Sequence, residues 1–328
     1  MINVGVIGTG VMGAGHARFI KDHIPGARVV GLSDIDLSKT ESLSHELGSV
    51  LFSTTDPQEL MNDSRVDAVV IASPDPLHVS HLRLAIKSNK QILCEKPIAT
   101  TFEDAKMISN EIRAYEKSVG KKMINFGFMR RFDPSYREVR RLIATGDFGN
   151  PTFFRTVTRN VSSTGATSTG LFTNIAIHDF DIYRWLFNDE WESIKSFYPK
   201  RSTLSPEGLD DPLIIIGKLR SGVTMVGDIV AFNNYGFDCR VEVVCEKGSI
   251  QIGTHGDVYT QVNGIGGSAK GGKMAENWMA RFEKSYIEEL KAWIQELSSG
   301  EINSDLATVE DALIANEICA LGLDSIKG

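Results

Sequence analysis

The sequence predicts an α/β domain with a doubly wound parallel sheet over residues 1–122, followed by an α+β domain with a large, mostly antiparallel open sheet over residues 123–328. Two observations predict this arrangement. In the first third of the chain, apolar strands alternate with helices, which is the pattern of βαβ units. From residue 123 onward, segments rich in β-branched residues are joined by short turns, which favours antiparallel strands.

A glycine-rich turn lies near the start of the chain. Apolar residues at 4–7 predict a strand, and residues 8–13 read G-x-G-x-x-G directly before a predicted helix. In this context the glycines allow a tight turn, close approach of the backbone to a pyrophosphate, and close packing of the helix on the strand. The N-terminus of the helix also favours phosphate charge. The residues predicted to bind a dinucleotide here are Gly8, Gly10, Val11, Met12 and Gly13.

An acidic residue follows at the spacing that a dinucleotide site needs. Residues 29–32 predict a second strand that leads into Asp34, about 21 residues after Gly13 and close to the ~20 expected of a ribose-binding acid. A carboxylate there accepts hydrogen bonds from the ribose hydroxyls and repels a 2′-phosphate. Strand, turn, helix and acid together predict a Rossmann domain that binds NAD rather than NADP. A turn with a purely structural role is the alternative.

The remaining elements follow from hydrophobic periodicity and turn residues. In the first domain we expect strands at 65–72 and 91–94, and helices at 76–89 and 102–117. In the second domain we expect strands at 152–158, 213–219, 223–231 and 240–245, and helices at 171–187, 278–297 and 308–326. Residues 264–272 hold five glycines and predict a surface loop.

The composition argues against several classes of function. The chain has 35 Lys and Arg against 42 Asp and Glu, with a net charge of −7 and no basic block, so nucleic acid is not an expected partner. No apolar run approaches the ~20 residues of a membrane span, so we expect a soluble, cytoplasmic protein. The four cysteines have no metal-ligand spacing, which agrees with reduced thiols.

Lys96 is the first candidate for a catalytic residue. It lies in Glu95-Lys96-Pro97, directly after the strand at 91–94, so it emerges at the carboxyl edge of the sheet, where ligands bind in open α/β folds. Most lysines are surface residues, and a surface role is the ordinary alternative. The position between a buried strand and a proline favours a functional role.

The predicted helix at 171–187 carries the second candidate. Asn174 and His178 are four residues apart and Asp181 is three further on, so the three share one helix face. A histidine, with an unperturbed pKa of ~6.5, can take and return a proton near neutrality, although many helical histidines are structural or lie at the surface. Residues 178–181 could also ligate a metal, but no further cluster completes a ligand shell, so we expect no metal.

These motifs together resemble those of the Gfo/Idh/MocA oxidoreductase family, and within it they are most similar to the inositol 2-dehydrogenases. The resemblance runs nearly end to end, and the combination is much more specific than any single motif. The motifs are the glycine turn, Ala72-Ser73-Pro74 with His78 behind it, Glu95-Lys96-Pro97, Gly127-Phe128-Met129-Arg130-Arg131-Phe132-Asp133 and Ile177-His178-Asp179-Phe180-Asp181.

The resemblance implies a catalytic set of Lys96, His178 and Asn174. Lys96 would donate a hydrogen bond to the substrate oxygen, and His178 would act as the general base when an alcohol is oxidised. The family has an aspartate four residues before the histidine, where this chain has Asn174. An asparagine can orient a hydroxyl or the imidazole, but it supplies no charge and accepts no proton.

The resemblance also implies binding residues. Arg130 would face the substrate, whereas for Arg131 and Arg137 a surface charge is an equal alternative. Tyr235 could reach a polyol or could be an aromatic residue of a hairpin. The residues implied to lie against the cofactor, besides those of the turn and Asp34, are Ser73, His78, Glu95 and Lys96.

Three functions are compatible with these residues. The favoured one is an NAD-dependent oxidoreductase that transfers a hydride between nicotinamide and a ring carbinol of a cyclic polyol or sugar. The second is an NAD-dependent glycosidase, and the third is a non-catalytic NAD- or sugar-binding protein in which Asn174 marks lost chemistry. A homodimer or homotetramer is expected by resemblance.

Overall fold

A computed structural model of the chain describes residues 1–161, 166–233, 236–253 and 275–327. The described residues form two compact units, and each is considered by itself. The first unit joins Met1–Phe132 to Lys284–Glu317, and the second joins Asp133–Glu283 to Ile318–Gly328. The predicted domain boundary between residues 122 and 123 stays a prediction. The predicted loop at 264–272 lies outside the described residues.

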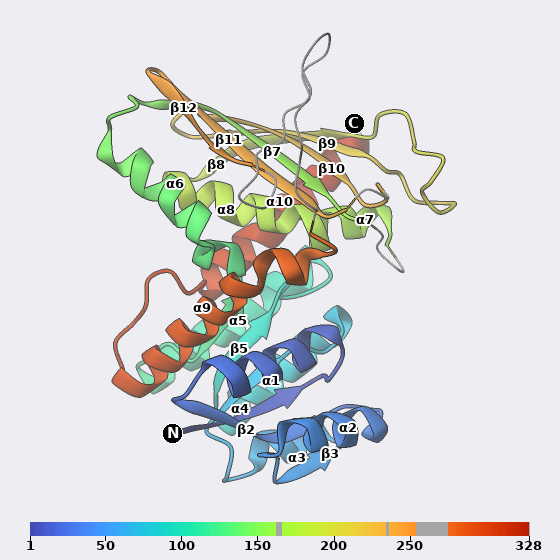
Figure 1. Ribbon diagram of the computed structural model, residues 1–328, viewed down its shortest axis with the longest axis vertical. Helices are drawn as coiled ribbons and strands as arrows, with labels where there is room; N and C mark the ends of the chain where they lie inside the picture. Colours follow the sequence, from blue (N-terminus) through green and yellow to red (C-terminus); the bar gives the residue numbers. More distant parts are fainter. Residues whose placement is uncertain (162–165, 234–235, 254–274, 328) are drawn as a thin grey trace. The chain divides into compact units, whose positions relative to one another are not determined.

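The first unit holds the doubly wound sheet that the sequence predicts (Figure 1). Six parallel strands lie in the order β3-β2-β1-β4-β5-β6. From β1 the chain adds β2 and β3 on one side and then β4, β5 and β6 on the other, so the switch point of the sheet lies between β1 and β4. The strands are β1 Ile2–Ile7, β2 Ala27–Ser33, β3 Phe52–Thr54, β4 Ala68–Ile71, β5 Gln91–Glu95 and β6 Ile124–Gly127. The helices are α1 Val11–His23, α2 Leu37–Leu47, α3 Pro57–Asn62, η1 Asp75–Leu77, α4 His78–Ser88, α5 Phe102–Val119, η2 Met129–Phe132, and parts of α9 Trp278–Ser299 and α10 Val309–Lys327.

Different helices cover the two faces of this sheet because side chains alternate along each strand. Val4 of β1 belongs to a buried cluster with Ile20 of α1 and Trp293 of α9. The next residue, Gly5, points the other way, and a Cβ there would lie 2.6 Å from the side chain of Leu60 on α3. The continuous apolar strands of the first unit are therefore buried on both sides, as parallel strands usually are.

Local sequence sets the ends of these helices. The side chains of Asp36 and Thr101 cap α2 and α5, where they accept hydrogen bonds from backbone N–H groups in the first turn. Gly48 and Gly120 end the same two helices, each with a φ of 71°, which glycine adopts at little cost. Caps of this kind explain why the predicted helix at 102–117 lies close to the observed bounds of α5.

Strand β6 extends the parallel sheet beyond residue 123, where the sequence analysis places the start of the second domain. It pairs with β5, from Ile124 beside Ile92 to Gly127 beside Glu95, and the N–H of Phe126 bonds the carbonyl oxygen of Ala307 at 2.9 Å. A strand of only four residues is too short for its pattern to distinguish a parallel from an antiparallel sheet. Only its tertiary partners distinguish the two.

The second unit is built on a mixed, mostly antiparallel sheet (Figure 1). Its strands lie in the order β12-β11-β7-β10-β9-β8, and all neighbours are antiparallel except the parallel pair β7 and β10. The strands are β7 Pro151–Arg159, β8 Trp191–Phe197, β9 Leu213–Leu219, β10 Thr224–Val230, β11 Asp238–Cys245 and β12 Gly248–Ile252. The helices are α6 Pro134–Thr145, α7 Ser168–Gly170, the π-helix η3 Leu171–Ala176, α8 Ile177–Phe187, and the remaining parts of α9 and α10.

Helices of the second unit pack on one face of its sheet, as Figure 1 shows for α6 and α8. The ring of Tyr183 on α8 stacks on Phe154 of β7 with centroids 5.1 Å apart, and its hydroxyl donates to the carbonyl oxygen of Val223 at 2.7 Å. Along β9 and β10, buried residues alternate with more exposed ones. The alternation follows because, among the described residues, helices cover only one face of this sheet.

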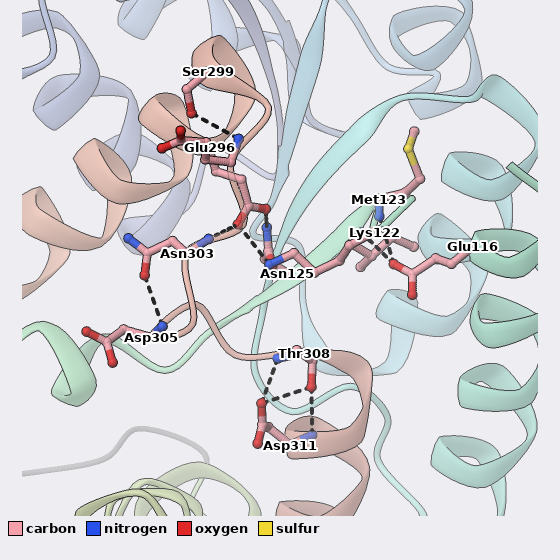
Figure 2. A network of polar contacts seen from close by, with 12 residues as sticks. Glu116, Lys122, Met123, Asn125, Glu296, Ser299, Asn303, Asp305, Thr308 and Asp311 are labelled. Carbon is pink, nitrogen blue, oxygen red and sulfur yellow. Dashed lines mark hydrogen bonds and ion pairs between the residues drawn. The ribbon is translucent and has the colours of Figure 1, made fainter. Parts of the chain in front are cut away.

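A polar network ties the end of α9 to the last strand of the first sheet (Figure 2). The carboxylate of Glu296 accepts hydrogen bonds from Lys122 Nζ at 2.9 Å, Asn125 Nδ2 at 3.2 Å and the backbone N–H of Asn303 at 2.7 Å. The carboxylate of Glu116 accepts from two backbone N–H groups where β6 begins. These bonds compensate the burial of charge and hold α9 against the sheet.

Asp311 stabilises the first turn of α10 in the same network. Its carboxylate accepts hydrogen bonds from the backbone N–H of Thr308 at 2.8 Å and from the Thr308 hydroxyl at 2.9 Å, and it pairs with Arg131 at 3.2 Å. Burial alone would raise the pKa of Asp311, but Arg131 and Thr308 outweigh it and lower the pKa to about 2. Arg131 is thus a buried structural residue rather than a surface charge.

We expect Asp311→Asn to lower the free energy of unfolding by about 2 to 3 kcal/mol at about pH 7. The reason is that the pKa of Asp311 is about 2 in the folded protein and ~3.9 in the unfolded chain, and this difference in pKa corresponds to about that free energy. A lowered pKa adds stability above the unfolded value, and this stability is lost as the pH falls from about 4 to about 2. Urea unfolding should therefore show the difference between the two proteins reduced to about half at pH ~3.

Glu310→Gln is the control for this measurement. It removes the neighbouring, exposed ion pair with Arg113, whose expected contribution is below about 1 kcal/mol. Equal stability of the Asp311→Asn and parent proteins at about pH 7 would contradict the role given to Asp311.

Candidate active site

The glycine turn between β1 and α1 is tightly packed on one side and open on the other. Gly8 has a φ of 86°, and a Cβ there would lie 2.6 Å from the backbone N of Ser73. A Cβ on Gly13 would lie 1.7 Å from the carbonyl oxygen of Gly8. A Cβ on Gly10 would meet no described atom within 4 Å. The space in front of Gly10 therefore suits the close approach of a diphosphate to the backbone.

The first turn of α1 presents backbone N–H groups beside this open space. Gly10 is the N-cap residue, and no side chain among the described residues caps the helix. Val11 is exposed and Met12 is partly exposed. The first N–H groups of a helix lack partners within the helix, so they can bind an anion. The predicted turn residues thus form one potential phosphate site.

Asp34 follows β2 and lies beside the glycine turn. Its Oδ2 accepts hydrogen bonds from the backbone N–H of Thr9 at 2.7 Å and the Thr9 hydroxyl at 3.0 Å, and its Oδ1 accepts from the N–H of Asp36 at 3.0 Å. Burial alone would raise the pKa of Asp34, but the bonds from Thr9 and Asp36 and the charge of Lys39 outweigh it and lower the pKa. The carboxylate is therefore ionised and held beside the turn, as a ribose-binding acid requires.

The loop after β4 places Ser73 beside two histidines of α4. The Ser73 hydroxyl lies 2.9 Å from Nδ1 of His81. His78 is fully buried, with Nδ1 2.6 Å from the carbonyl oxygen of Pro97 and Nε2 2.9 Å from the carbonyl oxygen of Ser73. The chain itself engages both ring nitrogens of His78. The ring therefore links two loops, and its expected contact with the cofactor stays a prediction.

Lys96 follows β5 directly, at the carboxyl edge of the parallel sheet, and is half-buried. The preceding residue, Glu95, is buried, and its Oε1 lies 2.8 Å from Nε2 of His16 on α1. Burial alone would raise the pKa of Glu95, but His16, Lys96 and His78 outweigh it and lower the pKa. Lys96 thus leaves a strand whose last residue is an ionised carboxylate anchored to α1.

A buried polar cluster lies behind Glu95, and the sequence analysis does not anticipate it. The ring of Tyr286 on α9 meets the ring of His16 edge to face, with centroids 5.7 Å apart. Burial, followed by the charges of Glu95 and Glu289, raises the pKa of Tyr286 well above its usual range, while Arg130 acts in the opposite direction. Arg130 is itself buried, and its contact with a substrate stays a prediction. Because its members are far apart in sequence, the cluster has no local signal.

The predicted helix at 171–187 consists of two parts in the second unit. Asn174 is exposed and lies in the π-helix η3, whereas His178 is buried in the first turn of α8 and Asp181 is buried further along it. π-Helical turns are rare and are frequent at functional sites. The sequence indicates one continuous helix because hydrophobic periodicity barely differs between the two helix types.

Asp179, next to His178, fastens α8 to the sheet of the second unit. Its carboxylate accepts hydrogen bonds from the hydroxyls of Thr156 at 2.7 Å and Thr158 at 3.3 Å, both on β7. The residue is fully buried. It therefore holds the turn of helix that carries His178. The sequence analysis quotes Asp179 only as part of a motif, and no pattern of spacing links it to the two threonines.

The structure groups the predicted site residues by unit. The glycine turn, Asp34, Ser73, Glu95 and Lys96 belong to the first unit, at or beside the carboxyl ends of its parallel strands. Asn174 and His178 belong to the second unit, and Tyr235 lies outside the described residues. Within the described ranges, no group of three or more His, Cys, Asp or Glu side chains could hold a metal ion. In the same part of the chain, no helix is long and apolar enough to cross a membrane.

Two family models match the chain. The model of the oxidoreductase family with an NAD-binding Rossmann fold, GFO_IDH_MocA, matches residues 2–122. The model of the GFO/IDH/MocA C-terminal domain matches residues 136–251. The two matches together span most of the chain and cover the glycine turn, Lys96 and His178.

Known proteins are similar to the chain over nearly its whole length. Inositol 2-dehydrogenase 1 of Saccharopolyspora erythraea is 34% identical over 301 residues, which cover 92% of this chain and 87% of the relative. Inositol 2-dehydrogenase of Mycolicibacterium smegmatis is 33% identical over 333 residues, covering 100% and 94%. The crystal structure of myo-inositol dehydrogenase from Lactobacillus casei in complex with NAD(H) and myo-inositol has a TM-score of 0.90 and 29% identity, covering 99% of this chain and 94% of that one.

Proposed function

The chain belongs to the GFO/IDH/MocA family of NAD-binding oxidoreductases, and from this premise we propose that it transfers a hydride between NAD and a ring carbinol of an inositol-like cyclic polyol. The position of Lys96 carries the proposal, because it places a cationic donor at the carboxyl edge of a dinucleotide-binding sheet. The similarity to relatives named inositol 2-dehydrogenases supports the substrate class.

The shape and charge of the first unit fit NAD. The open space at Gly10 and the N-terminus of α1 suit the diphosphate, and the ionised Asp34 suits the ribose hydroxyls of NAD. Bound NAD would supply the hydride acceptor, carbon 4 of its nicotinamide. In alcohol oxidation, Lys96 would donate a hydrogen bond to the substrate oxygen, and His178 would take the hydroxyl proton.

Asn174 would orient the substrate hydroxyl or the His178 ring by hydrogen bonds, but as an amide it would supply no charge and accept no proton. This residue is the specific observation that favours a second candidate, an NAD- or polyol-binding protein without turnover. The binding protein predicts thermal stabilisation by ligands and no growth of NADH absorbance with any polyol. The dehydrogenase predicts both thermal stabilisation by ligands and growth of NADH absorbance with its polyol substrate.

The test is an assay of the purified protein with NAD and a panel led by myo-inositol, scyllo-inositol, glucose and levoglucosan. Growth of NADH absorbance with one of these compounds would establish the reaction class and the substrate. Release of sugar from glycosides without net NADH would favour an NAD-dependent glycosidase. Stabilisation by NAD and polyol with neither product would favour the binding protein.

We expect Asp34→Ala to weaken the preference for NAD over NADP. The variant loses a charged acceptor for the ribose hydroxyls and the repulsion of a 2′-phosphate, so kcat/KM for NAD should fall by about 10- to 100-fold while that for NADP does not fall. Steady-state kinetics with both cofactors measures the change. Asp36→Asn is the matched control, because it neutralises an acid two residues away that caps α2, and it should keep the preference for NAD. An unchanged ratio in Asp34→Ala would refute the assignment.

We also propose a homodimer or homotetramer that forms through the face of the second unit's sheet that no described helix covers. Phe197 and Ile216 are 48% and 45% exposed on this face, and Ile214, Val226 and Val230 are partly exposed beside them. Apolar side chains that gather on an exposed sheet face, here between the charged residues Lys195, Lys218 and Asp228, often mark an interface. Light scattering should give a multiple of the 36.1 kDa chain mass, and Ile216→Lys should lower it. Ile302→Lys, at a 72% exposed site in the first unit, should leave the mass unchanged. A monomeric parent protein would refute the proposal.

A cytoplasmic location is proposed from the cysteines, whose spacing indicates reduced thiols rather than a disulfide framework. Cys94, Cys239 and Cys245 are buried. Burial raises the pKa of Cys94 well above its usual range, so this thiol is unreactive. Recovery of the native protein in a cell fraction outside the cytoplasm would refute this location.

A further inference from the structure

We propose that His78 is a doubly protonated imidazolium that ties the loop after β4 to the loop after β5 and so positions Lys96. The residue would touch neither substrate nor cofactor through its nitrogens, and it would act through the backbone on either side of Lys96. The catalytic part of this role rests on the proposed hydride transfer. The charge of the ring does not rest on it.

The geometry of the ring requires two donors. Nδ1 of His78 lies 2.6 Å from the carbonyl oxygen of Pro97, and Nε2 lies 2.9 Å from the carbonyl oxygen of Ser73. A carbonyl oxygen only accepts hydrogen bonds, and a neutral imidazole has a single N–H. In a neutral ring, one nitrogen lone pair would therefore face a carbonyl lone pair in a fully buried site. Only the protonated ring donates to both oxygens.

The surroundings of His78 can hold this charge. Glu95 is buried, and its carboxylate pairs with His16 at 2.8 Å. After His16 and Lys96, the charge of His78 also lowers the pKa of Glu95 against the opposing effect of burial. Burial, and then the charge of His78, lowers the pKa of His81 to about 4, so this second ring is neutral. His16 and Lys96 also face the Glu95 carboxylate. A buried cation whose N–H groups are all hydrogen-bonded, and which lies near a carboxylate, is tolerated in a protein interior.

The two bonds of His78 hold the backbone beside Lys96, the proposed hydrogen-bond donor to the substrate oxygen. Pro97 follows Lys96 in sequence, and its carbonyl group is bound by His78. Glu95 precedes Lys96, and its side chain is bound by His16 of α1. The strands β4 and β5 are neighbours in the sheet, so the clamp joins two adjacent strand ends. Lys96 therefore lies between two anchored residues, and these restrict the position of its Cα atom, from which the side chain extends.

The charge of the ring is tested by NMR of the unmodified protein labelled with ¹⁵N-histidine. At about pH 8 an unperturbed histidine, with a pKa of ~6.5, is almost entirely neutral. We expect both ring nitrogens of one histidine to remain protonated at this pH, and His78→Gln to remove that signal. A spectrum in which every histidine has an unprotonated ring nitrogen would overturn the proposal. This measurement needs no substrate, so it is independent of the proposed function.

The positioning role is tested by kinetics on His78→Gln. A glutamine carries both of its donor hydrogens on one nitrogen, so it does not reproduce two N–H groups on separate ring atoms, and it carries no charge. We expect kcat to fall by about tenfold or more, with the Kd for NAD within about threefold of the parent value. His81→Gln is the matched control, because it removes a buried ring from the same helix without releasing Pro97, and its kcat should stay within about threefold.

The outcomes separate the two proposals. If no substrate is turned over by the parent protein, the proposed function fails, and the NMR spectrum still decides the charge of His78. If His78→Gln keeps the parent kcat, or loses no more than His81→Gln, the positioning role is refuted even when the ring is doubly protonated. If His78→Gln does not fold, the spectrum is compared with that of His16→Gln, because His16 pairs with Glu95 and could also be doubly protonated. Loss of the signal in His16→Gln would refute the charged clamp, and its persistence there would support it.

Discussion

Replacing Lys96 with methionine should lower kcat for polyol oxidation by about 10²-fold or more. The substitution keeps a side chain of similar length but removes the donor that would polarise the substrate oxygen and stabilise its developing negative charge. The Kd for NAD should change much less, because the glycine turn and Asp34 are untouched. Steady-state kinetics on the substrate found in the panel, with a fluorescence titration of NAD, measures both quantities.

The control for Lys96→Met is Lys87→Met. Lys87 is an exposed residue on α4, so the same change of charge there should leave kcat unaltered. Lys96→Arg adds a second comparison, because it keeps the charge and moves the donor atoms, and it should recover only part of the rate. A Lys96→Met protein with a near-normal kcat would remove the main support for the proposed mechanism.

Replacing His178 with glutamine should lower kcat for alcohol oxidation by about 10²- to 10³-fold. The amide of glutamine can form hydrogen bonds, but it cannot take the proton that leaves the substrate hydroxyl. The parent enzyme should lose activity as the pH falls below the titration of this histidine, since only the neutral ring is a base. The variant should have lost this limb of the pH–rate profile.

A surface histidine gives the control for this experiment. His45 is exposed on α2, and His45→Gln should keep both the rate and the acid limb of the profile. If His178→Gln retains the acid limb with a reduced rate, another group is the base and His178 has a structural role. The buried position of His178 in α8, which Asp179 fastens to β7, is compatible with either result.

Much of the fold could be predicted because its signals are local. Hydrophobic periodicity and caps located α5 and most strands of the second unit to within a few residues. Two elements show what a local pattern does not predict. The apolar residues of β6 contain no indication of their partner, and the π-helix that holds Asn174 has nearly the same periodicity as an α-helix. Pairing and helix type at these positions depend on distant contacts.

The sequence by itself determined the chemistry that depends on spacing along the chain: the glycine turn, the acid Asp34 after the second strand, and Lys96 at the end of a buried strand. These signals are local because a strand, a turn and a helix N-terminus are built from consecutive residues. Only the tertiary structure decided how the side chains are held and charged. His16 bonds Glu95 across 79 positions of sequence, and His78 bonds two loops at once. Such contacts depend on which strands are neighbours in the folded sheet, and no pattern along the chain records that.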